Sequence, residues 1–77
     1  VMERSVKALI YFDGQYYCAK CFEIDVFTQG RTVDETIKNL KEAVALHLEG
    51  VDPAEYGLAK SPSLLIMFEC EIQPTHA

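Results

Sequence analysis

The chain has 77 residues, 49% of them hydrophobic and 25% charged, which suits one small domain with a thin core. Its net charge of −5 and its scattered seven Lys and Arg residues argue against direct nucleic-acid binding, because phosphate contacts need a clustered basic surface. No apolar run approaches the roughly 18 residues of a membrane span, and no signal peptide is recognised, so we expect a cytoplasmic protein.

The first part of the chain predicts three strands. Residues 4–12 are rich in β-formers and alternate apolar side chains with more polar ones. Asp13-Gly14 is a strong hairpin-turn dipeptide, so residues 15–23 are expected to return as an antiparallel strand. A short third extended segment follows at residues 26–29.

The second part predicts a helix and a last strand. Thr32 and Glu35 have capping-box spacing, and apolar residues recur behind them at three- and four-residue steps. Gly50 suits a C-terminal cap, so the helix is expected over residues 33–49. A strongly apolar run then predicts a strand over residues 63–72.

The order β-β-β-α-β predicts an α+β fold, in which one helix packs on one face of a four-stranded mixed sheet. Alternation assigns the apolar side chains to the two faces, and no second helix exists to cover the far one. That open face is expected to carry Leu9, Tyr11, Tyr16, Leu65 and Met67. Because monomers rarely leave such a patch open, we expect this face, or a sheet edge, to be an interface of a homo-oligomer.

The stretch Cys18-Ala-Lys-Cys21 has the C-x-x-C spacing of redox pairs and zinc sites. On a strand, however, residues three apart point to opposite faces and lie about 10 Å apart, whereas a disulfide needs Cα atoms about 4.4 to 6.8 Å apart. We therefore expect neither a metal nor a redox site. Cys21 and Cys70 are predicted to be small core residues, and Cys18 a surface thiol.

The sequence shows no clear catalytic constellation. Glu23 and Asp25 form a close acidic pair, which acid–base catalysis could use, but no polar cluster in the apolar strands completes a site. No serine has a histidine base nearby in the sequence, and His47 is expected to be a flanking surface residue. We predict a protein without enzymatic activity, cofactor or metal.

The segment Thr28-Gln29-Gly30, just before the helix, has two interpretations. It could expose backbone amides to an anion or substrate at the helix N-terminus. The alternative, which we favour, is that Gly30 makes a tight turn with positive φ and Thr32 caps the helix.

Residues 16–50 carry two linked motifs, T/S-Q-G-x-T-x-x-E-A and a helix of the form N-L-x-E-A-x-x-L-x-L-E. The residues that fit are Thr28, Gln29, Gly30, Thr32, Glu35, Asn39, Leu40, Glu42, Ala43, Leu46, Leu48 and Glu49. In these motifs the chain resembles the HicB-like antitoxin family. Phe22 and Thr36 stand where the family usually has proline and alanine.

The resemblance implies a truncated ribonuclease-H-like fold without catalytic acids. It also implies a partner, a small basic HicA-type toxin that cleaves mRNA and is neutralised by occlusion of its active site. The exposed residues around the motif that we expect to face this toxin are Glu23, Asp25, Gln29 and Arg31. The sequence ends too soon after the last strand for the DNA-binding domain that many family members carry, so operator binding is not expected.

Two other interpretations stay open. The chain could be a solitary HicB-like domain that self-associates and has no toxin. It could also be an enzyme on a small ligand, which would need a pocket that holds Glu23, Asp25 or His47.

Overall fold

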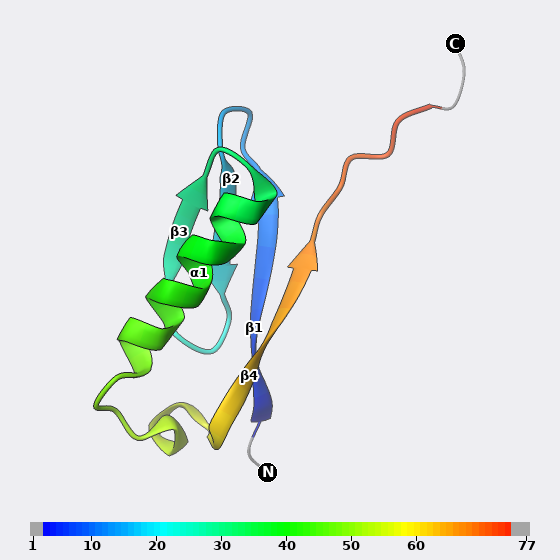
Figure 1. Ribbon diagram of the computed structural model, residues 1–77. Coiled ribbons are helices and arrows are strands. Elements are labelled where there is room, and N and C mark those ends of the chain that lie inside the picture. Colours follow the sequence, from blue (N-terminus) through cyan, green and yellow to red (C-terminus); the bar gives the residue numbers. More distant parts are fainter. Residues whose placement is uncertain (1–2, 75–77) are drawn as a thin grey trace.

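The computed structural model describes residues 3–74 and has the element order β-β-β-α-β (Figure 1). The elements are β1 (Glu3–Phe12), β2 (Tyr17–Cys21), β3 (Phe27–Gly30), α1 (Val33–Leu48), the short 3-10 helix η1 (Pro53–Tyr56) and β4 (Leu58–Phe68). One helix packs on a four-stranded mixed sheet, so the predicted α+β fold class is confirmed.

The sheet has the strand order β3-β2-β1-β4. The first three strands form an antiparallel meander, and β4 pairs parallel to β1 after the crossover through α1. A parallel neighbour requires such a crossover, and the helix supplies its length. The two edges of the sheet are therefore β3 and β4.

The hydrophobic core lies between α1 and one face of the sheet. Every second residue of the central part of β1 is buried, which is the pattern of a strand with one covered face. The buried cluster consists of Val6, Ala8, Ile10, Ala19, Ile24, Val26, Leu40, Val44 and Leu58. Figure 1 shows that α1 lies over β2 and β3, with β4 at the far edge beyond it.

The helix follows its sequence signals closely. Thr32 Oγ1 accepts a hydrogen bond from the Glu35 N–H at 3.0 Å, as the capping box predicts. The Glu35 carboxylate reaches back to the N–H of Arg31 at 3.4 Å, one residue beyond the usual partner. The helix ends at Leu48, just before the left-handed Gly50. Neither helix within residues 3–74 combines the length and the apolarity that crossing a membrane requires.

The last strand differs from its prediction at both ends. It begins at Leu58 rather than at residue 63, because the segment after η1 already pairs with the start of β1. It ends at Phe68 rather than at residue 72: Phe68, opposite Ile10, is its last paired residue, and the Glu69 N–H makes one further bond to the Ile10 carbonyl. Residues 69–74 continue as a chain that leaves the body of the protein (Figure 1).

The earlier C-terminal end of β4 corrects a sequence-based assignment. Cys70 was predicted to be a core residue, but it is exposed, as is Ile72, at 93%. The strand β2 is shorter than predicted. Asp13 Oδ1 accepts hydrogen bonds from the N–H groups of Gln15 and Tyr16, which widens the turn and delays the strand to Tyr17.

Candidate protein-binding surface

The sheet face opposite α1 carries a row of side chains that crosses all four strands. The register aligns Phe27, Lys20, Leu9 and Met67 as neighbours on successive strands. Phe27 is 58% exposed and Met67 40% exposed. No element within residues 3–74 covers this face, which we call the open face (Figure 1).

The residues predicted for the open face are largely brought together there. Leu65 pairs with Lys7 beside this row and is 50% exposed, and Tyr11 pairs with Cys18 on its other side. Tyr16 lies apart, in the turn before β2, where its N–H is bound by Asp13. Phe27 was missed, because Val26, Phe27, Thr28 and Gln29 show no apolar–polar alternation and only the pairing with Lys20 places Phe27 on this face.

Cys18 was predicted to be a surface thiol, and this is wrong because it is only 2% exposed. The Asp13 turn folds over it: its Sγ lies 3.5 Å from Asp13 Oδ2 and 4.0 Å from Gln29 Oε1. Burial, and then the hydrogen bond and charge of Asp13, raise the pKa of the Cys18 thiol. The thiol is therefore protonated at neutral pH and a poor nucleophile.

Cys21 lies on the other side of the strand, where it packs against the hydrophobic core. The two sulfurs of the C-x-x-C stretch thus belong to different faces of β2, and all three cysteines are free. Within residues 3–74, no three His, Cys, Asp or Glu side chains come together in a way that could hold a metal ion.

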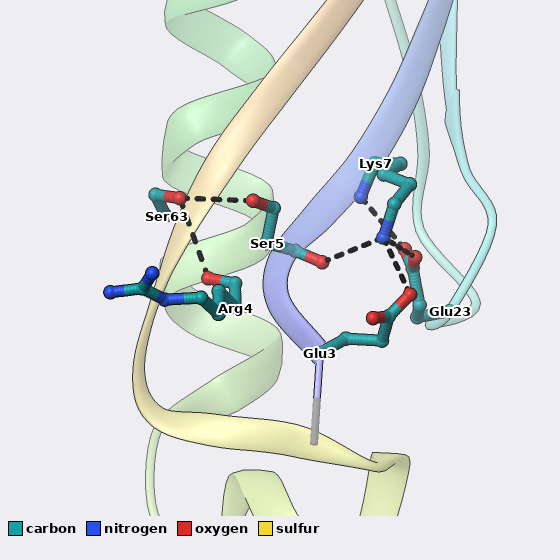
Figure 2. Close-up of polar contacts among 6 residues, drawn as sticks. All are labelled: Glu3, Arg4, Ser5, Lys7, Glu23 and Ser63. Atoms are coloured by element: carbon teal, nitrogen blue, oxygen red, sulfur yellow. Dashed lines mark hydrogen bonds and ion pairs between the residues drawn. The ribbon is translucent and has the colours of Figure 1, made fainter. Parts of the chain in front are cut away.

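Glu23 makes an internal contact that closes the end of β2 (Figure 2). Its Oε1 accepts a hydrogen bond from the backbone N–H of Lys7 at 2.7 Å, and its Oε2 pairs with Lys7 Nζ at 3.0 Å. Lys7 Nζ also contacts Glu3 Oε1 at 2.9 Å. The carboxylate therefore takes the place of the backbone acceptor that β2 would supply if it continued beyond Cys21. The Glu23 side chain, expected among the exposed residues, is only 15% exposed.

This contact shifts the ionisation of both partners. Burial alone would raise the pKa of Glu23, but the hydrogen bonds from the N–H and Nζ of Lys7 outweigh it, so the pKa lies below its usual value. The hydrogen bonds that Lys7 Nζ donates to Glu3 and Glu23 raise the pKa of Lys7 in turn.

The other residues predicted to face a toxin lie along the edge strand β3. Asp25 precedes the strand, Gln29 belongs to it and Arg31 follows it, and all three are exposed. A strand of this length extends about 13 Å, so the three side chains line the edge instead of forming one cluster. The backbone oxygen of Gln29 accepts a hydrogen bond from Asn39 Nδ2 at 3.0 Å, which fastens the edge to α1.

Gly30 is required for a reason other than the predicted one. Its φ is not positive, so the tight-turn interpretation is wrong. A Cβ at this position would lie 2.7 Å from Thr36 Oγ1 and 2.8 Å from Thr36 N. The first turn of α1 therefore approaches β3 so closely that only glycine fits.

Thr36, which sequence reasoning did not single out as a contact, is the other half of this close approach. It is fully buried, and its hydroxyl lies 2.7 Å from the Thr32 carbonyl and 3.2 Å from the Tyr17 carbonyl. The hydroxyl thereby links α1 to β2. Three polar groups of the Thr-Gln-Gly region, on Gln29, Thr32 and Thr36, are thus engaged in internal contacts.

Two shallow hollows mark the surface. One, of about 550 Å³, is lined by Phe12, Tyr17, Phe68, Glu69, Cys70 and Glu71. The other, of about 530 Å³, is lined by Arg4, Ser5, Ala59, Ser61 and Ser63. Neither holds Glu23, Asp25 or His47, which the enzyme interpretation needs. His47 instead packs its ring on Tyr56, at 5.5 Å between centroids.

Comparisons of the chain with protein-family models, curated proteins and solved structures find no match. The resemblance to HicB-like antitoxins therefore rests on the sequence motifs in residues 16–50 alone.

Proposed function

We propose that the protein is a non-enzymatic, cytoplasmic protein-binding module of the HicB antitoxin type. Its partner is a small basic HicA-type toxin that cleaves mRNA, which it neutralises by occlusion. The observation that carries the proposal is the open face, where Phe27, Leu9 and Met67, with Lys20 between the first two, form a row across the sheet. Uncovered apolar surface of this kind is typical of protein-binding sites.

The surroundings of this row support a protein partner. Asp25, Gln29 and Arg31 line the β3 edge beside it and form a polar rim, as interfaces commonly have around an apolar centre. The net charge of −5 favours association with a basic protein through long-range attraction.

The motif residues support the family relation in a different way. Thr32 caps α1, Asn39 fastens it to β3, and Leu40 is fully buried in the core. These residues therefore specify the packing of one helix on a meander, which is what a truncated ribonuclease-H-like domain requires. They leave the open face and the β3 edge for recognition.

The proposal is tested with a HicA-like toxin encoded by a neighbouring gene. We expect the two proteins to form a stable complex, and RNA cleavage by the toxin to be suppressed. Phe27→Ser should weaken the complex about tenfold or more, because it removes exposed apolar surface from the row. Phe22→Ser is the matched control, because Phe22 is 55% exposed but lies outside the row.

If no small basic RNA-cleaving protein is encoded nearby or binds, the antitoxin role is wrong for this chain. The apolar open face would then favour the second candidate, a solitary HicB-like domain that associates with itself.

A further inference from the structure

We propose that the segment 68–74 of one copy adds as a strand to the free edge of β4 in a second copy, and that the second copy reciprocates. The sheet of each copy would then gain a further strand, antiparallel to β4. Four features of the structure lead to this arrangement.

The first feature is that β4 occupies an edge although its residues suit the interior of a sheet. Leu65 and Met67 are 50% and 40% exposed on the open face, and Phe68 is 46% exposed on the α1 side. Leu64 and Ile66 are only half-buried, because α1 lies over β2 and β3. Strands that are apolar on both faces are typical of sheet interiors, whereas edge strands are normally protected by charges.

The second feature is the row of backbone groups at this edge. The Glu69 N–H donates to the Ile10 carbonyl at 2.9 Å, so the odd-numbered residues of β4 turn their backbone groups towards β1. Leu64, Ile66 and Phe68 consequently present N–H and C=O groups outward. Within residues 3–74 no strand lies on that side of β4.

The third feature is that the chain after β4 has the sequence of a strand but no neighbour. Phe68, Cys70 and Ile72 alternate with Glu69, Glu71 and Gln73. This period of two predicts a strand with one apolar side. The segment instead leaves the body in an extended path, and Ile72 is 93% exposed (Figure 1).

The fourth feature is that the free edge of β4 and the segment 68–74 match each other when two copies pair antiparallel about Phe68. The opposing pairs are then Phe68 with Phe68, Ile66 with Cys70, Leu64 with Ile72, and Pro62 with Pro74. The outward N–H and C=O groups of the first three pairs can form an antiparallel hydrogen-bond ladder. The ladder ends at Pro62 and Pro74, which have no N–H to donate. On the other face, Met67 opposes Glu69 and Leu65 opposes Glu71, so no like charges stand directly opposite.

The two-fold axis that this pairing places at Phe68 would also bury an aromatic cluster. The ring of Tyr17 lies 5.0 Å from that of Phe12 and 6.1 Å from that of Phe68, and the three line the hollow of about 550 Å³ at the root of the segment. Pairing about Phe68 would bring the two clusters together and bury Phe12, which is 54% exposed. We take the partner to be a second copy because each copy carries both a free β4 edge and a segment that can pair with such an edge, so the contact is self-complementary.

A disulfide tests the register directly. In the proposed ladder, residue 66 of one copy and Cys70 of the other form a hydrogen-bonded pair with Cα atoms about 5.5 Å apart, which a disulfide can bridge. Within one extended chain the same two positions are about 13 Å apart and cannot be bridged. Ile66→Cys should therefore give a disulfide-linked dimer in a glutathione redox buffer, with the linkage identified by peptide mapping, and Ile66→Cys with Cys70→Ser should not.

Sedimentation of the unlinked protein tests the energetics. The unchanged chain should be dimeric, and Ile72→Asp should raise the dissociation constant at least about tenfold, because each copy loses a buried apolar contact. Gln73→Asp is the matched control and should change it less than about threefold. Both positions are exposed outside the core, so the variants fold.

A monomer at about 100 µM, or a dimer that Ile72→Asp leaves as tight as before, would overturn the proposal. So would a linkage of the introduced cysteine to any cysteine other than Cys70. No toxin takes part in these experiments, so their outcome is independent of the antitoxin role.

Discussion

The carboxylate of Glu23 shows how a single side chain can end a strand. It binds both the backbone N–H and the Nζ of Lys7, and its side chain is only 15% exposed. These bonds favour the ionised form and lower the pKa of Glu23. Since the pKa is lower in the folded than in the unfolded protein, the contact stabilises the fold above the usual glutamate pKa, and this stabilisation is lost as the pH falls through the lower folded value.

We therefore expect Glu23→Gln to destabilise the protein by about 1 kcal/mol at pH 7 and to flatten the loss of stability below about pH 4. The measurement is urea unfolding at several pH values. Glu3→Gln is the control, because Glu3 is 56% exposed and meets only the Nζ of Lys7. Glu3→Gln should change the free energy of unfolding by close to zero. A Glu23→Gln profile parallel to that of the unchanged chain would contradict this account.

Asp13 is a second carboxylate whose contribution is lost in acid. Backbone hydrogen bonds from Tyr16 and Gln15 lower its pKa. The same turn buries the thiol of Cys18. Asp13 therefore positions the start of β2 and also shields Cys18, which strand alternation alone would place on the solvent-exposed face.

At the scale of elements, the contact between β3 and the first turn of α1 determines how the helix sits on the sheet. Gly30 allows the approach, and the buried hydroxyl of Thr36 bonds to carbonyls of both the helix and β2. Asn39 adds a further bond one turn later. The glycine of the Thr-Gln-Gly motif is thus explained as a packing requirement.

Gly30→Ala should cost about 1–3 kcal/mol, because the added methyl group overlaps atoms that are close-packed. The cost should persist when Thr36→Ala is added, since the backbone N of residue 36 would still lie 2.8 Å from the new carbon. Thermal and urea unfolding measure both variants. A Gly30→Ala protein as stable as the unchanged chain, or full rescue by Thr36→Ala, would show that the contact is looser than described.

At the scale of the whole molecule, one short helix covers only part of a sheet that is apolar on both sides. The core is correspondingly small, and small domains commonly need a further source of stability. The open face and the β4 edge are the two places where a partner could provide it. Our proposals assign a toxin to the first and a second copy to the other.

Linked folding and association should then be visible in thermal unfolding. We expect the Tm of the unchanged chain to rise with protein concentration. Only folded copies associate, so a higher concentration shifts the equilibrium towards the folded dimer. The Tm of Ile72→Asp should depend on concentration much less. Equal concentration dependence in the two proteins would argue against a contribution of the β4 edge.

Much of the fold could be predicted because local patterns specify it. The Thr32 cap and the apolar stripe place α1 to within one residue of its observed C-terminal end. The alternation in residues 4–12 gives the buried side of β1 correctly. The candidate surface was less predictable. Glu23 binds Lys7 on β1, and the Asp13 turn covers Cys18.

The sequence by itself determined the order of the elements, the helix bounds and which residues of a strand share a face, because periodicity and capping depend on neighbours along the chain. Only the tertiary structure decided where β4 ends, why residue 30 must be glycine and which thiol is buried. Each of these depends on packing between two elements, which periodicity and capping do not encode: β1 with β4, α1 with β3, and the Asp13 turn with β2.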